Sequence, residues 1–164
     1  MSDAPKDLAA AIAAAWPTAS TWTMRDGKLA VRIEAEQLVP FVEWAMRAGF
    51  TRFVDLSVVD DPQHAERFDV NYVLYSLERR CWLRIKSRTA DSMPSLVPQF
   101  GAANWYEREA FDLFGVQFEG HPNLVRILLP DDADFHPLRR DHPLGGEPID
   151  FTVTREQPGR RNQP

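Results

Sequence analysis

The chain has 164 residues, of which 44% are hydrophobic, so it is long and apolar enough to form one globular domain with its own core. Its formal net charge of −5 argues against a nucleic-acid-binding protein, for which a basic stripe would be expected. No run of about 18 apolar residues occurs, which argues against a membrane-spanning helix.

The first residues and the single cysteine predict the cellular compartment. Residues 1–7 carry two acids and one base ahead of an apolar run, whereas a signal peptide has a basic leader and a mitochondrial transit peptide is Arg-rich. Cys81 alone cannot form an intrachain disulfide or a Cys-based metal or iron–sulfur site. We therefore expect a reduced, cytoplasmic protein.

The N-terminal part predicts a helix, a hairpin and a second helix. Residues 5–15 are Ala-rich and predict a short helix. Residues 19–34 predict a β-hairpin, because Asp26 and Gly27 suit a tight primed turn. In residues 36–48, apolar residues recur at helical spacing.

Three further strands are predicted next. Residues 51–60 contain an almost continuous, β-branched apolar run, which predicts a central strand. Residues 68–75 and 81–86 show an alternating pattern, which predicts two strands that each bury one face. This order of elements predicts an α+β fold with an antiparallel or mixed sheet and helices on one face.

Two more helices are predicted after the strands. Residues 93–100, which contain two prolines, predict a short helix, and residues 104–115 predict a clearer one. Asn104 stands at the expected N-cap and Glu107 at the capping-box position three residues later. Gly115 is expected to end this helix.

The composition changes after Gly115. Seven of the 13 prolines lie in residues 116–164, yet apolar residues persist there, which is not typical of a disordered tail. A structureless loop of this length is also uncommon inside a compact domain. We therefore expect an α+β domain in residues 1–115, followed by a long extended C-terminal arm in residues 116–164 that docks on a partner protein.

Two acidic side chains of the helix expected at 104–115 are candidates for chemistry. Glu109 and Asp112 share a helix face, and Arg108 is placed to pair with Asp112 four residues later. Such carboxylates could act as acid and base or hold a metal, but the chain lacks the Glu-x-x-His motifs of a dimetal site in a helix bundle. A charged face that engages basic groups is the favoured interpretation.

The predicted arm contains His-Pro pairs and an ionic cluster. His121, His136 and His142 each precede proline, and their spacings of 15 and 6 residues match no common zinc pattern. They indicate restricted, extended backbone instead. The Arg-Arg-Asp sequence at 139–141 could anchor a partner through Arg–carboxylate pairs. The chain has no phosphate-binding loop or nucleophile elbow, so its residues predict a non-catalytic interaction subunit.

Four segments carry a resemblance to a known family. They are residues 103–118, 120–124, 126–131 and 136–143. Among them, residues 107–115 read EREAFDLFG and the last segment reads HPLRRDHP. These segments resemble the 30 kDa-type (C) subunit of the proton-pumping respiratory NADH:quinone oxidoreductase (complex I). One departure is Phe135, which stands where members of the family commonly have glycine.

The resemblance implies a role and a place in an assembly. It implies a non-catalytic structural and assembly subunit of the peripheral arm of this translocase, supporting electron transfer from NADH to quinone by partner subunits. The FMN and the iron–sulfur clusters would lie in those partners, and this chain would hold no cofactor. Its partners would be the quinone-site (D) subunit and the (B) subunit that holds the terminal iron–sulfur cluster, on the cytoplasmic side of the cell (inner) membrane. Membrane contact would come only through the complex, and no nucleic acid would be bound.

The resemblance assigns no catalytic, cofactor-binding or metal-binding residue to this chain. It implies twelve interface or structural residues, which are Glu107, Arg108, Glu109, Asp112, His121, Pro122, Arg126, His136, Pro137, Arg139, Arg140 and Asp141. One alternative is the equivalent subunit of a related membrane-bound hydrogenase or of a quinone reductase with another electron donor. Another is a stand-alone enzyme that uses Glu109 and Asp112 as acid and base.

Overall fold

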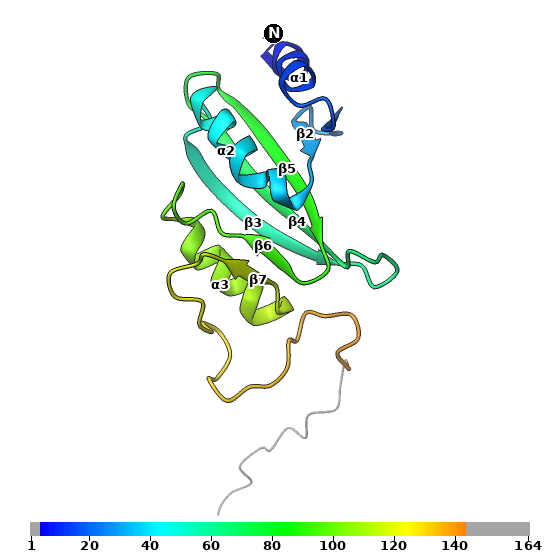
Figure 1. The fold of residues 1–164 in the computed structure, drawn as a ribbon, viewed down its shortest axis with the longest axis vertical. Helices are drawn as coiled ribbons and strands as arrows, with labels where there is room; N and C mark the ends of the chain where they lie inside the picture. The colour runs from blue at the N-terminus through cyan, green and yellow to red at the C-terminus, as the bar shows by residue number, and fades with distance from the viewer. Residues whose placement is uncertain (1–3, 144–164) are drawn as a thin grey trace, which may run out of the picture.

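The structure, a computed structural model, describes residues 4–143 (Figure 1). Its main sheet has the strand order β1-β2-β5-β4-β3, in which the strands are β1 (Ser20–Thr23), β2 (Leu29–Arg32), β3 (Arg52–Asp60), β4 (Phe68–Ser76) and β5 (Cys81–Thr89). Neighbouring strands are antiparallel, except that β2 and β5 are parallel. The predicted hairpin and the three later strands are therefore confirmed, in a mixed sheet. Two details of the prediction are wrong. β3 lies at the edge of the sheet rather than in its centre, and its apolar run is covered by packing against a helix instead of by a further strand. The hairpin turn is not primed, because Gly27 has a positive φ and Asp26 does not.

Helix α2 covers one face of this sheet. The helices of the described residues are α1 (Ala4–Ala15), α2 (Leu38–Arg47), preceded by the 3-10 turn η1 (Ala35–Gln37), and α3 (Ala103–Phe114). α2 lies across β3, β4 and β5 (Figure 1). Because its apolar residues recur every three or four positions, it buries one stripe, made of Leu38, Phe41, Val42 and Ala45.

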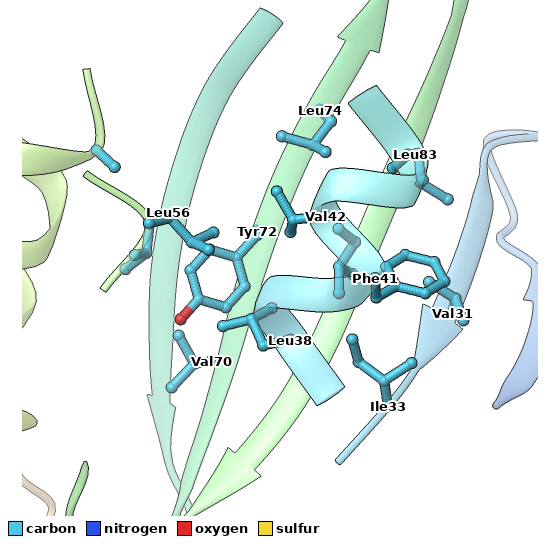
Figure 2. Packing of buried hydrophobic residues seen from close by; sticks show 14 of the residues in the cluster. Val31, Ile33, Leu38, Phe41, Val42, Leu56, Val70, Tyr72, Leu74 and Leu83 are labelled. Carbon is cyan, nitrogen blue, oxygen red and sulfur yellow. The ribbon is translucent and has the colours of Figure 1, made fainter. Parts of the chain in front are cut away.

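The main core lies between α2 and the sheet. Figure 2 shows Val42 of α2 next to Tyr72 and Leu74 of β4, and Phe41 of α2 toward Leu83 of β5 and Val31 of β2, all of which are buried. Alternate residues of a strand share a face, so the period-two pattern of β4 and β5 brings these side chains together. Each such side chain contributes about 1.5–3 kcal/mol when it is fully buried.

Helix α3 begins differently from the prediction. Its N-cap residue is Ala102, one residue before the helix starts, and no side chain caps it. The predicted cap by Asn104 and the capping box with Glu107 are therefore wrong. The predicted end is confirmed, because Gly115 follows the helix in the left-handed conformation with φ of +78°.

A short parallel pair of strands replaces the helix expected at residues 93–100. β6 (Ser92–Pro94) pairs with β7 (Gln117–Glu119), and only turns lie between β6 and α3. Three residues are too few to show an alternating pattern, so no sequence signal indicates these strands. α3 is thereby the crossover helix of a small βαβ unit.

The fold continues past Gly115, where the arm is predicted to begin. Val116 and Phe118 are buried in the core. Residues 120–143 contain no helix or strand and pass along α3 toward the loop between β3 and β4 (Figure 1). The rest of the predicted arm lies outside the described residues. In the part of the chain that the structure describes, no helix is long and apolar enough to cross a membrane.

Candidate subunit interface around helix α3

The C-terminal end of α3 is covered by residues that follow it in the chain. The last four carbonyl groups of an α-helix have no partner within the helix. In α3 each of them has a partner, namely Gly115 N–H for Phe111 at 2.8 Å, His136 Nδ1 for Asp112 at 2.9 Å, Leu138 N–H for Leu113 at 3.1 Å and Arg139 Nε for Phe114 at 2.6 Å. The charged guanidinium also lies favourably at the negative end of the helix dipole.

The side chain of Asp112 binds the same segment. It is fully buried, and its Oδ2 accepts the backbone N–H groups of residues 127–129 at 2.7–3.0 Å. Its Oδ1 accepts Arg126 Nη1 at 2.7 Å. Burial opposes ionisation and is the largest single influence, but these hydrogen bonds together outweigh it and lower the pKa of Asp112 to about 2. The carboxylate is therefore ionised and fully engaged within the chain.

Arg126 fixes the path of the backbone ahead of His136. Besides Asp112, its guanidinium donates to the carbonyls of Ala133 at 2.6 Å and Phe135 at 3.4 Å. The ring of Phe135 stacks on the imidazole of His142, with 5.2 Å between the ring centroids. The segment is thus held by one buried ion pair and by contacts of its own.

Gly115 allows this close approach. A β-carbon at position 115 would overlap the guanidinium of Arg139 and the imidazole of His136. The left-handed backbone of Gly115 would also strain any residue with a side chain. Glycine is therefore required both by the helix end and by the packing of residues 136–139.

A second ionic group, here called the Arg67 cluster, joins the loop before β4 to the end of the described chain. Arg67 donates Nε and Nη2 to the buried carboxylate of Asp60 at 2.5 and 2.6 Å, and Nη1 and Nη2 to Asp141 at 2.8 Å each. Asp60 also accepts the Arg140 N–H at 2.6 Å. Hydrogen bonding to Arg67 lowers the pKa of both carboxyl groups.

Asp60 and Arg67 take part in this site although no sequence pattern indicates them. Arg67 lies 74 residues before Asp141, and Asp60 lies 80 residues before Arg140. No spacing rule connects residues so far apart, and the local pattern around Asp60 indicates only the end of a strand. The side chains of Arg139 and Asp141 and the backbone N–H of Arg140 therefore bind this chain itself, through partners that the sequence does not indicate, while the side chain of Arg140 is exposed.

Glu107 is a buried residue of the domain core. Its carboxylate accepts Ser95 Oγ and the Leu96 N–H, each at 2.6 Å, and so ties the turn after β6 to α3. Burial raises the pKa of Glu107 to about 7, against the opposing effect of these hydrogen bonds. Burial, with a smaller effect of Glu107, also raises the pKa of the fully buried Tyr72.

Arg108 holds the first half of the covering segment. It does not pair with Asp112 as predicted, because its Nε and Nη2 donate to the carbonyls of Val125 at 3.0 Å and Arg126 at 3.2 Å. Its guanidinium also lies over the exposed Trp105, 5.2 Å from the ring centroid. Arg108 thus binds the backbone of the covering segment and makes no ion pair with Asp112.

The predicted His-Pro residues hold bends of the backbone. His121 Nε2 lies 3.4 Å from the carbonyl of Asn104 near the start of α3, and its Nδ1 accepts the Asn123 N–H at 3.0 Å. Burial lowers the pKa of His121. Pro122 is exposed and Pro137 is half-buried. His121 and His136 thus bind backbone groups through their imidazoles, and each precedes a proline, whose ring fixes φ.

Apolar side chains remain exposed on α3 and on the segment that covers it. They are Trp105 (63% exposed), Leu128 (61%), Leu138 (51%) and Val125 (44%). We call these four residues the arm surface. Large exposed apolar side chains on α3 and on the segment that covers it make this part of the chain a candidate interaction surface.

The acid–base pair of the stand-alone enzyme alternative is not assembled. Asp112 is buried and holds four donors, whereas Glu109, on the same helix, is exposed. Within residues 4–143, no group of three or more His, Cys, Asp and Glu side chains is arranged to hold a metal. The alternative of a stand-alone carboxylate enzyme therefore finds no support in this geometry.

Comparison with known sequences decides the family. Residues 31–148 match the family described as the respiratory-chain NADH dehydrogenase, 30 Kd subunit. The chain belongs to this family. The C subunit of the NADH-quinone oxidoreductase of Methylorubrum extorquens (strain PA1) is 41% identical over 135 residues, which are 79% of this chain and 62% of that protein. The corresponding protein of Rhodobacter capsulatus is 41% identical over 152 residues, or 89% of this chain and 76% of that protein.

The chain spans less than two thirds of the length of the Methylorubrum relative. Two solved structures resemble its fold. The trypsin-resistant fragment (1-134) of Nqo5 has a TM-score of 0.66 and 26% identity, covering 73% of this chain and 99% of the fragment. A chain of the membrane-bound sulfane sulfur reductase, an archaeal respiratory membrane complex, has a TM-score of 0.75 and 25% identity, covering 85% of each. The predicted α+β class is thereby confirmed for this member of the 30 Kd subunit family.

Proposed function

We propose that this chain is a structural, non-catalytic subunit of the peripheral arm of a proton-pumping NADH:quinone oxidoreductase. The single observation that carries the proposal is how the chain uses its signature residues. Glu107, Asp112, Arg126 and Arg139 all bind groups of the chain itself, and none points its charge into an open reaction site. Such residues shape a surface rather than perform a reaction.

The arm surface and the family support a proposal for the partners. Trp105, Val125, Leu128 and Leu138 are exposed around a rigidly held segment, as suits a permanent protein partner. We assign this surface to the quinone-site subunit, with the terminal iron–sulfur cluster subunit beside the domain. The residues carried over from the resemblance then act mainly by presenting this surface.

The chemistry belongs to the partners in this proposal. Asp112 is saturated by four donors and Glu107 is enclosed in the core, so neither carboxylate is free to bind a substrate. FMN and the iron–sulfur clusters are assigned to other subunits, and none to this chain. The chain is placed on the cytoplasmic side of the membrane, in contact with lipid only through the complex.

A second candidate is the equivalent subunit of a respiratory complex with another electron donor. The similarity to a chain of the sulfane sulfur reductase favours it, because that chain matches over 85% of this one. The two candidates share the same structural role and differ in the partner subunits that select the donor.

Purification from the native host tests the proposal. The full chain carries an affinity tag, membranes are solubilised in mild detergent, and the co-purifying proteins are identified by mass spectrometry. We expect a large assembly with inhibitor-sensitive NADH:quinone activity. Recovery of hydrogenase-type subunits would select the second candidate, and recovery of the chain alone would contradict both. A stoichiometric transition metal in the isolated chain would contradict the non-catalytic role.

A further inference from the structure

A groove runs between α3 and the edge strand β3. α3 packs along β3, which is the last strand of the five-stranded sheet (Figure 1). The groove has a volume of about 310 Å³, and its apolar walls are formed by Leu56, Val58, Tyr106, Ala110, Leu113 and Leu138. The ionic and hydrogen-bonding contacts at the end of α3 do not fill this space, so the groove is open to a group from outside.

Two carboxylates belong to the same groove. Asp55 of β3 and Glu109 of α3 both line it, and its lining contains no basic residue. Neither makes an ion pair within residues 4–143, whereas Asp60, Asp69 and Asp112 each have a basic partner there. The groove therefore combines apolar walls with two negative charges that the described chain leaves unbalanced.

This combination fits one kind of side chain. Lysine and arginine have long aliphatic stems that pack on apolar surface and a cationic head that stays near carboxylates or water. A purely apolar side chain would leave both carboxylates without a counter-charge and partly desolvated, which costs free energy. An acidic side chain would be repelled. Charge complementarity thus selects a basic occupant.

The groove is continuous with the proposed interface. Leu138 forms part of its wall and is also one of the exposed residues of the arm surface. The backbone of Leu138 is fixed by its hydrogen bond to the Leu113 carbonyl, so this wall is rigid. A partner that covers Leu138 would therefore also lie at the mouth of the groove.

We propose that the groove between α3 and β3 receives a lysine or arginine side chain of a partner subunit, whose charge is balanced by Asp55 and Glu109. The inference rests on the proposed function, because it requires a protein partner on the arm surface. It gives Glu109, one of the predicted interface residues, a specific role as a positioning contact for a basic side chain.

Two other occupants are distinguished from this one by the test. One is the segment 144–164, which contains Arg155, Arg160 and Arg161, although three acids in the same segment balance them. The other is a second copy of this chain. We favour a different subunit because the groove joins the arm surface, which the proposed function assigns to a partner.

The test uses the tagged full chain in its native host. Two groove variants are compared: the neutral Asp55→Asn with Glu109→Gln, and the reversed Asp55→Lys with Glu109→Lys. The matched control reverses two exposed acids away from the groove, Glu36→Lys with Glu43→Lys. Thermal unfolding of each purified chain by circular dichroism establishes that the variants fold.

The yield of co-purified assembly is the readout. We expect reversal of the groove charges to lower this yield about tenfold or more, since like charges oppose binding, with a smaller loss in the neutral variant and none in the control. Equal yields from groove variants and control would overturn the groove proposal and leave the subunit role standing. A wild-type chain recovered without any assembly would overturn both.

Photo-crosslinking identifies the occupant. A benzoylphenylalanine at Leu138 is irradiated in the purified assembly, and the linked peptide is sequenced. We expect a peptide of another subunit with a lysine or arginine near the linked residue. A link to residues 144–164, to a second copy of the chain, or to a partner segment without a basic residue would overturn the proposal.

Discussion

Asp112 and Glu107 are both fully buried carboxylates of α3, yet their pKa values move in opposite directions. Asp112 accepts three backbone N–H groups and one guanidinium, so its charged form is compensated despite burial. Glu107 has only two neutral donors, from Ser95 and Leu96, and burial prevails. The number and charge of the donors decide which carboxylate is ionised.

Replacing Asp112 with asparagine tests whether its charged carboxylate stabilises the fold. The carboxylate accepts hydrogen bonds at both Oδ1 and Oδ2, whereas an amide has one accepting oxygen. Its NH2 group would face N–H donors, and Arg126 would lose its counter-charge. We expect Asp112→Asn to lower the free energy of unfolding by about 3–5 kcal/mol, as for a broken buried ion pair. Urea unfolding of the full chain measures it, with the exposed Asp132→Asn as control. Equal stability of the two variants would contradict the assigned role.

The raised pKa of Glu107 makes stability depend on pH. The folded-state pKa of about 7 lies above the reference value of 4.5, so the folded chain binds more protons between these values. The contribution of Glu107 to the free energy of unfolding is therefore fully present below pH 4.5 and falls as pH rises to about 7, by up to about 3 kcal/mol.

Glu107→Gln should remove this dependence, so the stability difference between wild type and variant should change across pH 4.5–7. Urea unfolding at several pH values measures it, and the exposed Glu109→Gln is the control. Asp112 acts in a separate window, because its lowered pKa removes stability only as pH falls below about 4 toward 2. A difference that stays constant with pH would show that Glu107 is ionised throughout.

At the level of elements, the sequence pattern predicted the longer strands and helices but not the shortest strands. The strands Phe68–Ser76 and Cys81–Thr89 and the helices each extend over enough residues to show a period, and the strand Arg52–Asp60 is indicated by its nearly continuous apolar run. β6 and β7 are too short to show a period, and their paired residues Met93 and Phe118 are both buried. A local rule also failed for Arg108, because Asp112, its predicted partner four residues later, pairs with the more distant Arg126 instead.

The end of α3 depends on Gly115, and alanine there should be costly in two ways. A left-handed residue with a side chain costs about 1–2 kcal/mol, and the overlap with Arg139 and His136 should add about 1–3 kcal/mol. Gly120→Ala separates these effects, because Gly120 has φ of +81° but open space around it. We expect thermal unfolding to show a clearly larger loss for Gly115→Ala than for Gly120→Ala. Equal losses would mean that backbone strain alone matters.

Across the full chain, the candidate site could be predicted only in part. The resemblance singled out the residues that meet at the end of α3, but it did not indicate that they bind one another. Arg126 and Asp112 are 14 residues apart, and Arg67 and Asp141 are 74 apart. Spacing rules for helices and strands do not reach these distances, so the pairing becomes visible only once the fold is known.

Removing Arg67 should loosen the end of the described chain without unfolding the domain. In Arg67→Ala, Asp141 loses its partner and Asp60 keeps only the Arg140 N–H. We expect hydrogen exchange at the Arg140 amide to rise about tenfold, while the Leu74 amide of the core exchanges as before. The exposed Arg47→Ala is the control. A uniform rise at both amides would mean that the Arg67 cluster supports the whole fold.

The contacts at the end of α3 also have a consequence for biosynthesis. The groups that complete this helix end lie up to 25 residues later in the chain, at Arg139 for the Phe114 carbonyl. At a synthesis rate of about 5–20 residues per second, α3 waits on the order of one to five seconds on the ribosome before these groups exist. Until then the carbonyls of Leu113 and Phe114 lack the partners that Leu138 and Arg139 provide. A prematurely terminated chain would keep this open helix end, which distinguishes it from a finished subunit before any partner is met.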